Sequence, residues 1–156
     1  YNGLDFGVSD PNALIRFDFE PGQKKVYVFD EYFQGGISLE QLAAEVKRRV
    51  GSAYVTCDSA GSQQILELCR MGVRAIPARK GAGSIQYGIQ WLQGYDILVD
   101  RRCTNFIREI SNYQWSKDAY GNATDIPCGT DDHLLDALRY ASEPVQHGGV
   151  TAGIRI

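Results

Sequence analysis

The sequence predicts a protein of the α/β class, in which helices flank both faces of one mixed β-sheet. Two observations carry this prediction. The first 34 residues alternate apolar and polar side chains with the period of a strand, and short turn sequences interrupt the alternation. Residues 38–113 then alternate helical patterns with short β-branched runs. Hairpins pair antiparallel whereas strands joined through helices run parallel, so the sheet contains both arrangements.

The opening segment is predicted to form three antiparallel strands. Residues 2–8 alternate apolar side chains with Gly and Asp, so Asp5 points away from the apolar side of its strand. Residues 12–20 and 24–34 repeat the alternation, and the turn sequences "SDPN" and "PGQ" separate the three runs. Tight turns of this kind join neighbouring antiparallel strands.

The later elements follow from helical spacing and from residues that start or stop a helix. Ser38 is a favourable N-cap for a helix that ends at Gly51, and a β-branched run then ends at Asp58. A helix at 62–72 and a strand at 73–78 complete a parallel βαβ unit. The remaining expected elements are a helix at 83–94 despite its internal Gly88, a strand at 95–100, a helix at 102–113 with Phe106, Ile107 and Ile110 inward, a hairpin or irregular loop at 113–129, and a long final helix.

Composition limits the classes of function. With 156 residues and 44% apolar composition, the chain fits one globular domain at 1–143, followed by a flexible glycine-rich tail at 144–156. No apolar run approaches the roughly 20 residues of a membrane-spanning helix, and no signal peptide is visible. The four cysteines form no CxxC pair, which argues against zinc, and a net charge of −3 does not favour nucleic-acid binding. A strand almost at residue 1 suggests a domain cut from a longer polypeptide.

Three groups of carboxylates occur where the predicted sheet can bring them together. Asp5 lies on the first strand, Asp58 follows the fourth strand, and the last long helix begins with several acidic residues. The first and fourth strands are expected to be parallel neighbours, so these two carboxylates can meet at one sheet edge. Carboxylates at close range repel unless cations bridge them, and hard oxygen ligands suit Mg²⁺ or Mn²⁺. Gly3 and Gly7 are expected to let metal and phosphate approach Asp5.

Each of these residues also has a structural interpretation. Asp58 before "SAGSQQIL" is an ordinary N-cap, and glycines beside a strand Asp often mark a bulge or a turn. In "GTDDHLLDALRYA", Thr130 or Asp131 can cap the last helix. Asp136 lies too far along for capping, and its structural alternative is a salt bridge with Arg139. One side of this helix carries Asp132, His133, Asp136 and Tyr140.

Four segments, in their order and spacing, resemble those of a known protein family: "GLDFG", "VTCDSAG", "RKGAGSI" and "DDHLLDALRYA". Over residues 1–142 the sequence resembles the C-terminal nuclease domain of the large terminase subunit of tailed bacteriophages. The resemblance implies a ribonuclease H-like fold and a metal-dependent endonuclease that cuts concatemeric double-stranded viral DNA during genome packaging. It implies two Mg²⁺ or Mn²⁺ ions, about 4 Å apart, that clamp the scissile phosphate while one activates the attacking water.

The resemblance also implies roles for individual residues. Asp5, Asp58 and Asp136 match the acidic triad of the family, with Asp5 expected to bridge both ions. His133 matches a position that is His or Asp in relatives and is expected to assist at the metal or the water. Asp132 is a further candidate ligand, and Glu31 at the end of a strand could contribute. The residues expected to contact DNA phosphates are Arg79, Lys80, Ser84, Lys24 and Lys25.

The resemblance extends to partners and location. The chain has no GxxxxGK[ST] loop, so the packaging ATPase of the family is expected in an N-terminal domain of the same polypeptide. The portal protein and the small terminase subunit are further expected partners, and the expected location is the host-cell cytoplasm, away from membranes. Three rival functions remain. They are a resolvase-type nuclease for branched DNA, a non-catalytic ribonuclease H-like interaction module, and half of an actin-like ATPase, for which the chain is too short.

Overall fold

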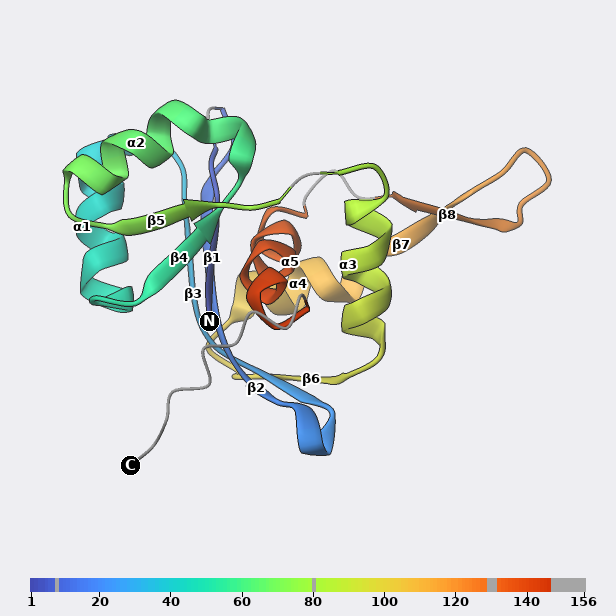
Figure 1. Ribbon diagram of the computed structural model, residues 1–156. Coiled ribbons are helices and arrows are strands. Elements are labelled where there is room, and N and C mark those ends of the chain that lie inside the picture. The colour runs from blue at the N-terminus through green and yellow to red at the C-terminus, as the bar shows by residue number, and fades with distance from the viewer. Residues whose placement is uncertain (8, 80, 129–131, 147–156) are drawn as a thin grey trace.

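The computed structural model describes residues 1–7, 9–79, 81–128 and 132–146. Within these residues, six strands form one sheet in the order β5-β4-β1-β2-β3-β6, and two more form a separate hairpin (Figure 1). The sheet strands are β1 (Asn2–Asp5), β2 (Asn12–Glu20), β3 (Lys25–Gln34), β4 (Tyr54–Cys57), β5 (Arg74–Pro77) and β6 (Asp96–Val99). The hairpin strands are β7 (Gln114–Lys117) and β8 (Ala123–Cys128).

The predicted fold class is confirmed by the strand directions. The pairs β1–β2 and β2–β3 are antiparallel, whereas β1–β4, β4–β5 and β3–β6 are parallel. The first and fourth strands are therefore parallel neighbours, as the sequence predicts. β1 lies inside the sheet and all four of its residues are buried. The hairpin of β7 and β8 projects from the body of the protein (Figure 1).

Helices cover both faces of the sheet. They are α1 (Leu39–Val50), α2 (Ser62–Arg70), α3 (Ser84–Gln93), α4 (Thr104–Asn112) and α5 (His133–Gln146), with short 3₁₀ helices η1 (Pro21–Gln23) and η2 (Ser59–Gly61). α1 and α2 bury Leu42, Val46 and Leu68 against one face. α4 and α5 bury Phe106 and Leu138 against the other, and α3 packs on α5 (Figure 1). Two apolar cores therefore sandwich one sheet.

The contact between α5 and β1 depends on Gly3. A Cβ atom at Gly3 would lie 1.8 Å from the carbonyl oxygen of Ala137 and 2.8 Å from the Cβ atom of Ala141. A Cβ atom at Gly7 would lie 1.9 Å from the carbonyl oxygen of Asp10. The expectation that these glycines admit metal and phosphate is therefore wrong for both. Gly3 admits the backbone of a helix, and Gly7 admits the turn that leads to β2.

Several local expectations are corrected or confirmed. Ile107 was expected to face inward but is 37% exposed, because Phe106 takes the inward position on α4 with no exposed area. Ser38 caps α1, as predicted, by accepting a hydrogen bond from the Gln41 backbone N–H. α5 continues to Gln146, past the expected domain end at 143, and residues 147–156 lie outside the described part of the chain. Every described helix is too short or too polar to cross a membrane.

We predict that Gly3→Ala destabilises the protein by about 3 kcal/mol or more, because the added methyl group meets helix backbone that cannot move aside alone. Urea unfolding followed by circular dichroism measures the loss. Gly22→Ala is the matched control, since nothing lies within 4 Å of a Cβ atom there. This control should stay within about 0.5 kcal/mol of wild type. Equal stability of both variants would contradict the close contact between α5 and β1.

Candidate active site

The predicted acidic residues meet in one pocket at the carboxyl ends of β1 and β4. The pocket has a volume of about 560 Å³ and also receives the start of α3 and the start of α5. Its lining includes the five predicted site residues Asp5, Asp58, Asp132, His133 and Asp136, together with Ser84. Crevices beyond the carboxyl ends of parallel strands are common ligand sites in α/β proteins. The structure therefore brings together residues that are up to 131 positions apart in the sequence.

The pairing of β1 with β4 places Asp5 beside Asp58. Leu4 is in register with Cys57, and the Asp58 backbone N–H donates a hydrogen bond of 2.9 Å to the Leu4 carbonyl oxygen. Each strand therefore ends on a carboxylate at the same edge. The Asp58 side chain also accepts from the Ala60 backbone N–H at 3.1 Å and caps η2. The capping interpretation of Asp58 is thus correct, and it coexists with a place in the pocket.

Asp5 is a buried carboxylate, 9% exposed, beneath the start of α5. One of its oxygens lies 3.1 Å from Nδ1 of His133. Burial raises the pKa of Asp5 to about 6; the His133 hydrogen bond opposes this rise, and repulsion from Asp136 and Asp58 adds to it. Ionisation of Asp5 is therefore less favourable in the folded protein than in a free chain.

His133 is the first residue of α5 and supplies a partial counter-charge for Asp5. Burial by itself would lower its pKa, but the hydrogen bond with Asp5 and the negative charge of Asp5 outweigh burial and leave the pKa raised. The imidazole is therefore protonated more readily than a free histidine. Without a metal, His133 and Asp5 form a hydrogen-bonded pair facing the pocket.

Asp136 and Asp132 reach the pocket from the start of α5. Because α5 begins at His133, Asp136 lies in its first turn, nearer the start than the sequence predicts. Its Oδ1 accepts from Arg139 Nη2 at 2.9 Å and Nε at 3.2 Å, so the salt bridge considered as an alternative is present. The pKa of Asp132 is raised by its burial and by the neighbouring charge of Asp136.

The side chains of the pocket are of the types that bind a divalent cation. Carboxylate oxygens with one imidazole are hard ligands that suit Mg²⁺ or Mn²⁺. Among the described residues, however, no three His, Cys, Asp or Glu side chains are arranged closely enough to hold a metal ion. His133 neutralises Asp5 instead, and Arg139 neutralises Asp136. The residue types fit a metal, and small side-chain movements would have to accompany its binding.

Glu109 on α4 holds the start of α5 in place, and the sequence analysis missed it. Its Oε2 accepts from the backbone N–H groups of Leu134 at 2.8 Å and Leu135 at 3.1 Å, which are free donors of a helix start. Burial raises the pKa of Glu109 to about 7, although these two hydrogen bonds oppose the rise. The sequence does hold a signal for Glu109: it follows Phe106 by three residues, which places both on the same buried side of α4. Thr130 and Asp131, the expected caps, lie outside the described residues.

Glu31 does not belong to the pocket. Its two oxygens accept from the backbone N–H groups of Asn105 at 3.0 Å and Phe106 at 2.8 Å, and from the Asn105 side chain. Glu31 on β3 therefore caps the start of α4. An acidic residue near a helix start satisfies free N–H groups and the positive end of the helix dipole. Its position at a strand end serves the attachment of α4.

The expected DNA-binding residues fall in two places. Ser84 lines the acidic pocket and also an adjoining hollow of about 390 Å³ that contains Arg79 and Arg139. Lys80, which lies between Arg79 and Ser84 in the sequence, is outside the described residues. Lys24 and Lys25 lie at the other end of the sheet, at the turn between β2 and β3 (Figure 1). On β2, Ala13 pairs with Asp5 and Glu20 pairs with Lys25. At about 3.3 Å per residue, this stretch of strand separates Lys25 from Asp5 by roughly 20 Å.

Comparison with known proteins identifies the family. Residues 5–143 match the family model described as the terminase RNAseH like domain. The chain belongs to this family. It is 33% identical to the terminase large subunit of Bacillus phage SPP1 over 96% of the chain, and 30% identical to the PBSX phage terminase large subunit of Bacillus subtilis over 89%. These matches cover 37% and 33% of the two relatives, so the chain spans about a third of their length.

Solved structures agree with this family assignment. The nuclease domain of the SPP1 large terminase, solved with bound Mn, matches with a TM-score of 0.86 and 33% identity over 92% of this chain and 85% of that chain. The nuclease domain of the P22 large terminase matches with a TM-score of 0.74 and 22% identity over 93% of this chain and 80% of that chain. The terminase domain described here therefore has the ribonuclease H-like fold that the resemblance implies.

Glu109 is predicted to make the stability of this terminase domain depend on pH. Its pKa is 4.5 in an unfolded chain and about 7 in the folded protein, so the folded state binds more protons between these values. The free energy of unfolding should therefore fall as pH rises from about 4.5 to about 7. Glu109→Gln should reduce that slope in urea unfolding series with EDTA present. Asp5 has an effect of the same sign and leaves a residual slope; an unchanged slope in Glu109→Gln would contradict the prediction.

Proposed function

We propose that this chain is a metal-dependent endonuclease domain that hydrolyses phosphodiester bonds of concatemeric double-stranded viral DNA during genome packaging. One observation carries the proposal. Asp5, Asp58 and Asp136, from three different elements, line a single pocket with Asp132 and His133. Support comes from the bound Mn in the SPP1 nuclease domain, to which this chain is 33% identical.

Each residue has a proposed role in that pocket. Asp5 and Asp58 would hold metal from the sheet, and Asp136 with Asp132 would hold it from α5. Asp5 is the carboxylate whose charge interacts with both Asp58 and Asp136, which favours it as a ligand shared by two ions. Two bound Mg²⁺ or Mn²⁺ ions supply charge stabilisation for the phosphate and a water nucleophile at neutral pH. His133 orients Asp5 through Nδ1 and can take up a proton at the pocket.

The proposal extends to DNA and protein partners. Ser84, Arg79 and Lys80 are proposed to contact DNA phosphates, because Ser84 lines the acidic pocket and Arg79 lies in the adjoining hollow. Lys24 and Lys25, at the other end of the sheet, are proposed to contact phosphates farther along the same duplex. Because the chain spans about a third of its relatives, we propose that a packaging ATPase domain precedes it in the full polypeptide. The portal protein, the small terminase subunit and the host cytoplasm complete the proposed setting.

We predict that the protein cuts supercoiled plasmid with Mn²⁺ or Mg²⁺, that EDTA stops cutting, and that Asp5→Asn lowers the rate about 100-fold or more. Asp5→Asn is the sharpest variant because it removes a carboxylate whose ionisation is less favourable in the fold than in a free chain, so the loss of charge should cost little stability. Asp136→Asn removes the negative charge that pairs with the buried Arg139, so its stability is measured beside its activity. Agarose gels report the product.

Asp18→Asn is the control, since Asp18 is exposed on β2 toward the end of the sheet that carries Lys25. It should cut as wild type does. Cutting by Asp5→Asn at the wild-type rate would sink the proposal, and so would inactivity of wild type with Mn²⁺. A four-way junction in the same assay distinguishes a resolvase, which would prefer the branched substrate.

A second prediction uses binding without turnover. Saturating Mn²⁺ at 100 times its dissociation constant stabilises a folded protein by about 2.7 kcal/mol. For a domain of this size we expect a rise in melting temperature of about 5–10 °C. Asp5→Asn and Asp58→Asn should show a much smaller rise, and Asp18→Asn the full rise. Scanning calorimetry with and without Mn²⁺ measures it, and an equal rise in all variants would place the metal elsewhere.

A further inference from the structure

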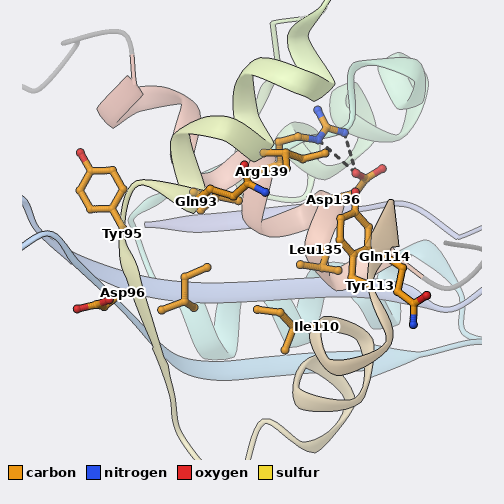
Figure 2. A pocket seen from close by; sticks show the side chains of 12 residues that line it. Gln93, Tyr95, Asp96, Ile110, Tyr113, Gln114, Leu135, Asp136 and Arg139 are labelled. Atoms are coloured by element: carbon orange, nitrogen blue, oxygen red, sulfur yellow. Dashed lines mark hydrogen bonds and ion pairs between the residues drawn. The ribbon is translucent and has the colours of Figure 1, made fainter. Parts of the chain in front are cut away.

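Arg139 on α5 is a buried cation that lines the acidic pocket beside Asp136. Only 7% of the residue is exposed, and it forms an ion pair with Asp136. Both of its bonding nitrogens, Nη2 at 2.9 Å and Nε at 3.2 Å, use the same carboxylate oxygen, Oδ1. Figure 2 shows the two side chains joined at the edge of a neighbouring apolar hollow of about 410 Å³. The ion pair engages one oxygen of Asp136, and the same residue lines the acidic pocket.

The stem of Arg139 fits into a space that Gly88 provides on α3. A Cβ atom at Gly88 would lie 2.6 Å from Cγ and 2.8 Å from Cδ of Arg139. The Arg139 guanidinium carbon also lies 4.6 Å from the centre of the Tyr140 ring, within the range of a cation–π contact. Glycine inside a helix costs about 1 kcal/mol relative to alanine, so Gly88 is unfavourable for α3 considered alone. Its place is explained by the arginine from α5.

Arg139 thereby links α3 to the carboxylate on α5. It lines the acidic pocket and also the hollow beside Arg79 and Ser84. Ser84 is the first residue of α3 and lines the same acidic pocket. The helix that begins at the proposed phosphate contacts therefore also seats the side chain that holds Asp136.

We propose that Arg139, seated against Gly88, is a positioning residue that fixes the Asp136 carboxylate for metal binding. The inference rests on the proposed function, since it concerns a ligand of the same site. A carboxylate held by one oxygen loses less conformational freedom when the other oxygen binds a cation. The guanidinium also offsets the repulsion that Asp136 meets from Asp5 and Asp132, which share the pocket. Residues that orient a metal ligand in this way typically change metal affinity 10-fold to 100-fold when removed.

The test measures Mn²⁺ affinity by isothermal titration, with circular dichroism as the check on folding. Arg139→Met should weaken Mn²⁺ binding about 10-fold to 100-fold. Arg139→Lys keeps the charge but cannot donate from two nitrogens of one planar group. Its Mn²⁺ affinity should lie between those of Arg139→Met and wild type. Gly88→Ala keeps every functional side chain and favours the helix, yet it should weaken binding because it displaces the Arg139 stem. Gly88→Ala decides the question if Arg139→Met does not fold.

Matched controls separate positioning from general damage. Arg108→Met removes an exposed arginine from α4, and Gln90→Ala adds an alanine to the exposed side of α3; neither should change the affinity. In an Asp136→Asn background, Arg139→Met should change the affinity less than about twofold, whereas a merely structural role would lower it equally in both backgrounds. Wild type that binds no Mn²⁺ refutes the proposed function itself. Wild type that binds Mn²⁺ while Arg139→Met binds it equally or more tightly overturns only the role of Arg139.

Discussion

The close approach of α5 to β1 at Gly3 is the contact on which the pocket depends. Helix backbone occupies the space where any other residue would place its Cβ atom, because the carbonyl oxygen of Ala137 lies 1.8 Å from that position. The first turn of α5 consequently lies over the end of β1, where His133 reaches Asp5. A side chain at residue 3 would push the helix outward. The carboxylates of strand and helix would then separate.

Electrostatic repulsion among the carboxylates of the pocket is the second constraint. Basic side chains of the protein itself reduce this repulsion. Burial raises the pKa of Asp5, and the negative charges of Asp136 and Asp58 add to the rise. His133 is paired with one carboxylate and Arg139 with another. These two pairs allow an acidic pocket to persist in a folded protein without a metal. A divalent cation in the proposed site would take over part of that neutralisation.

Several residues have two roles where the sequence analysis set alternatives against each other. Asp58 caps η2 and lines the pocket, and Asp136 pairs with Arg139 while facing the same pocket. Each carboxylate has two oxygens with separate acceptor sites, so one structural hydrogen bond does not exhaust it. A local explanation for an acidic residue therefore does not exclude a functional one.

Local periodicity determined the order of strands and helices, the antiparallel start and the position of Asp5 on the side of β1 opposite Leu4. The parallel pairing of β1 with β4 followed from the order of the elements, which is that of ribonuclease H-like sheets. Periodicity could not determine which element covers which face of the sheet, because an apolar side can pack against any other apolar side. Tertiary structure decided that Gly3 and Gly88 receive a helix backbone and an arginine stem. It also decided that Glu31 and Glu109 hold helix starts, and that Lys24 and Lys25 lie far from the pocket. These outcomes depend on contacts between segments distant in sequence, which no local pattern encodes.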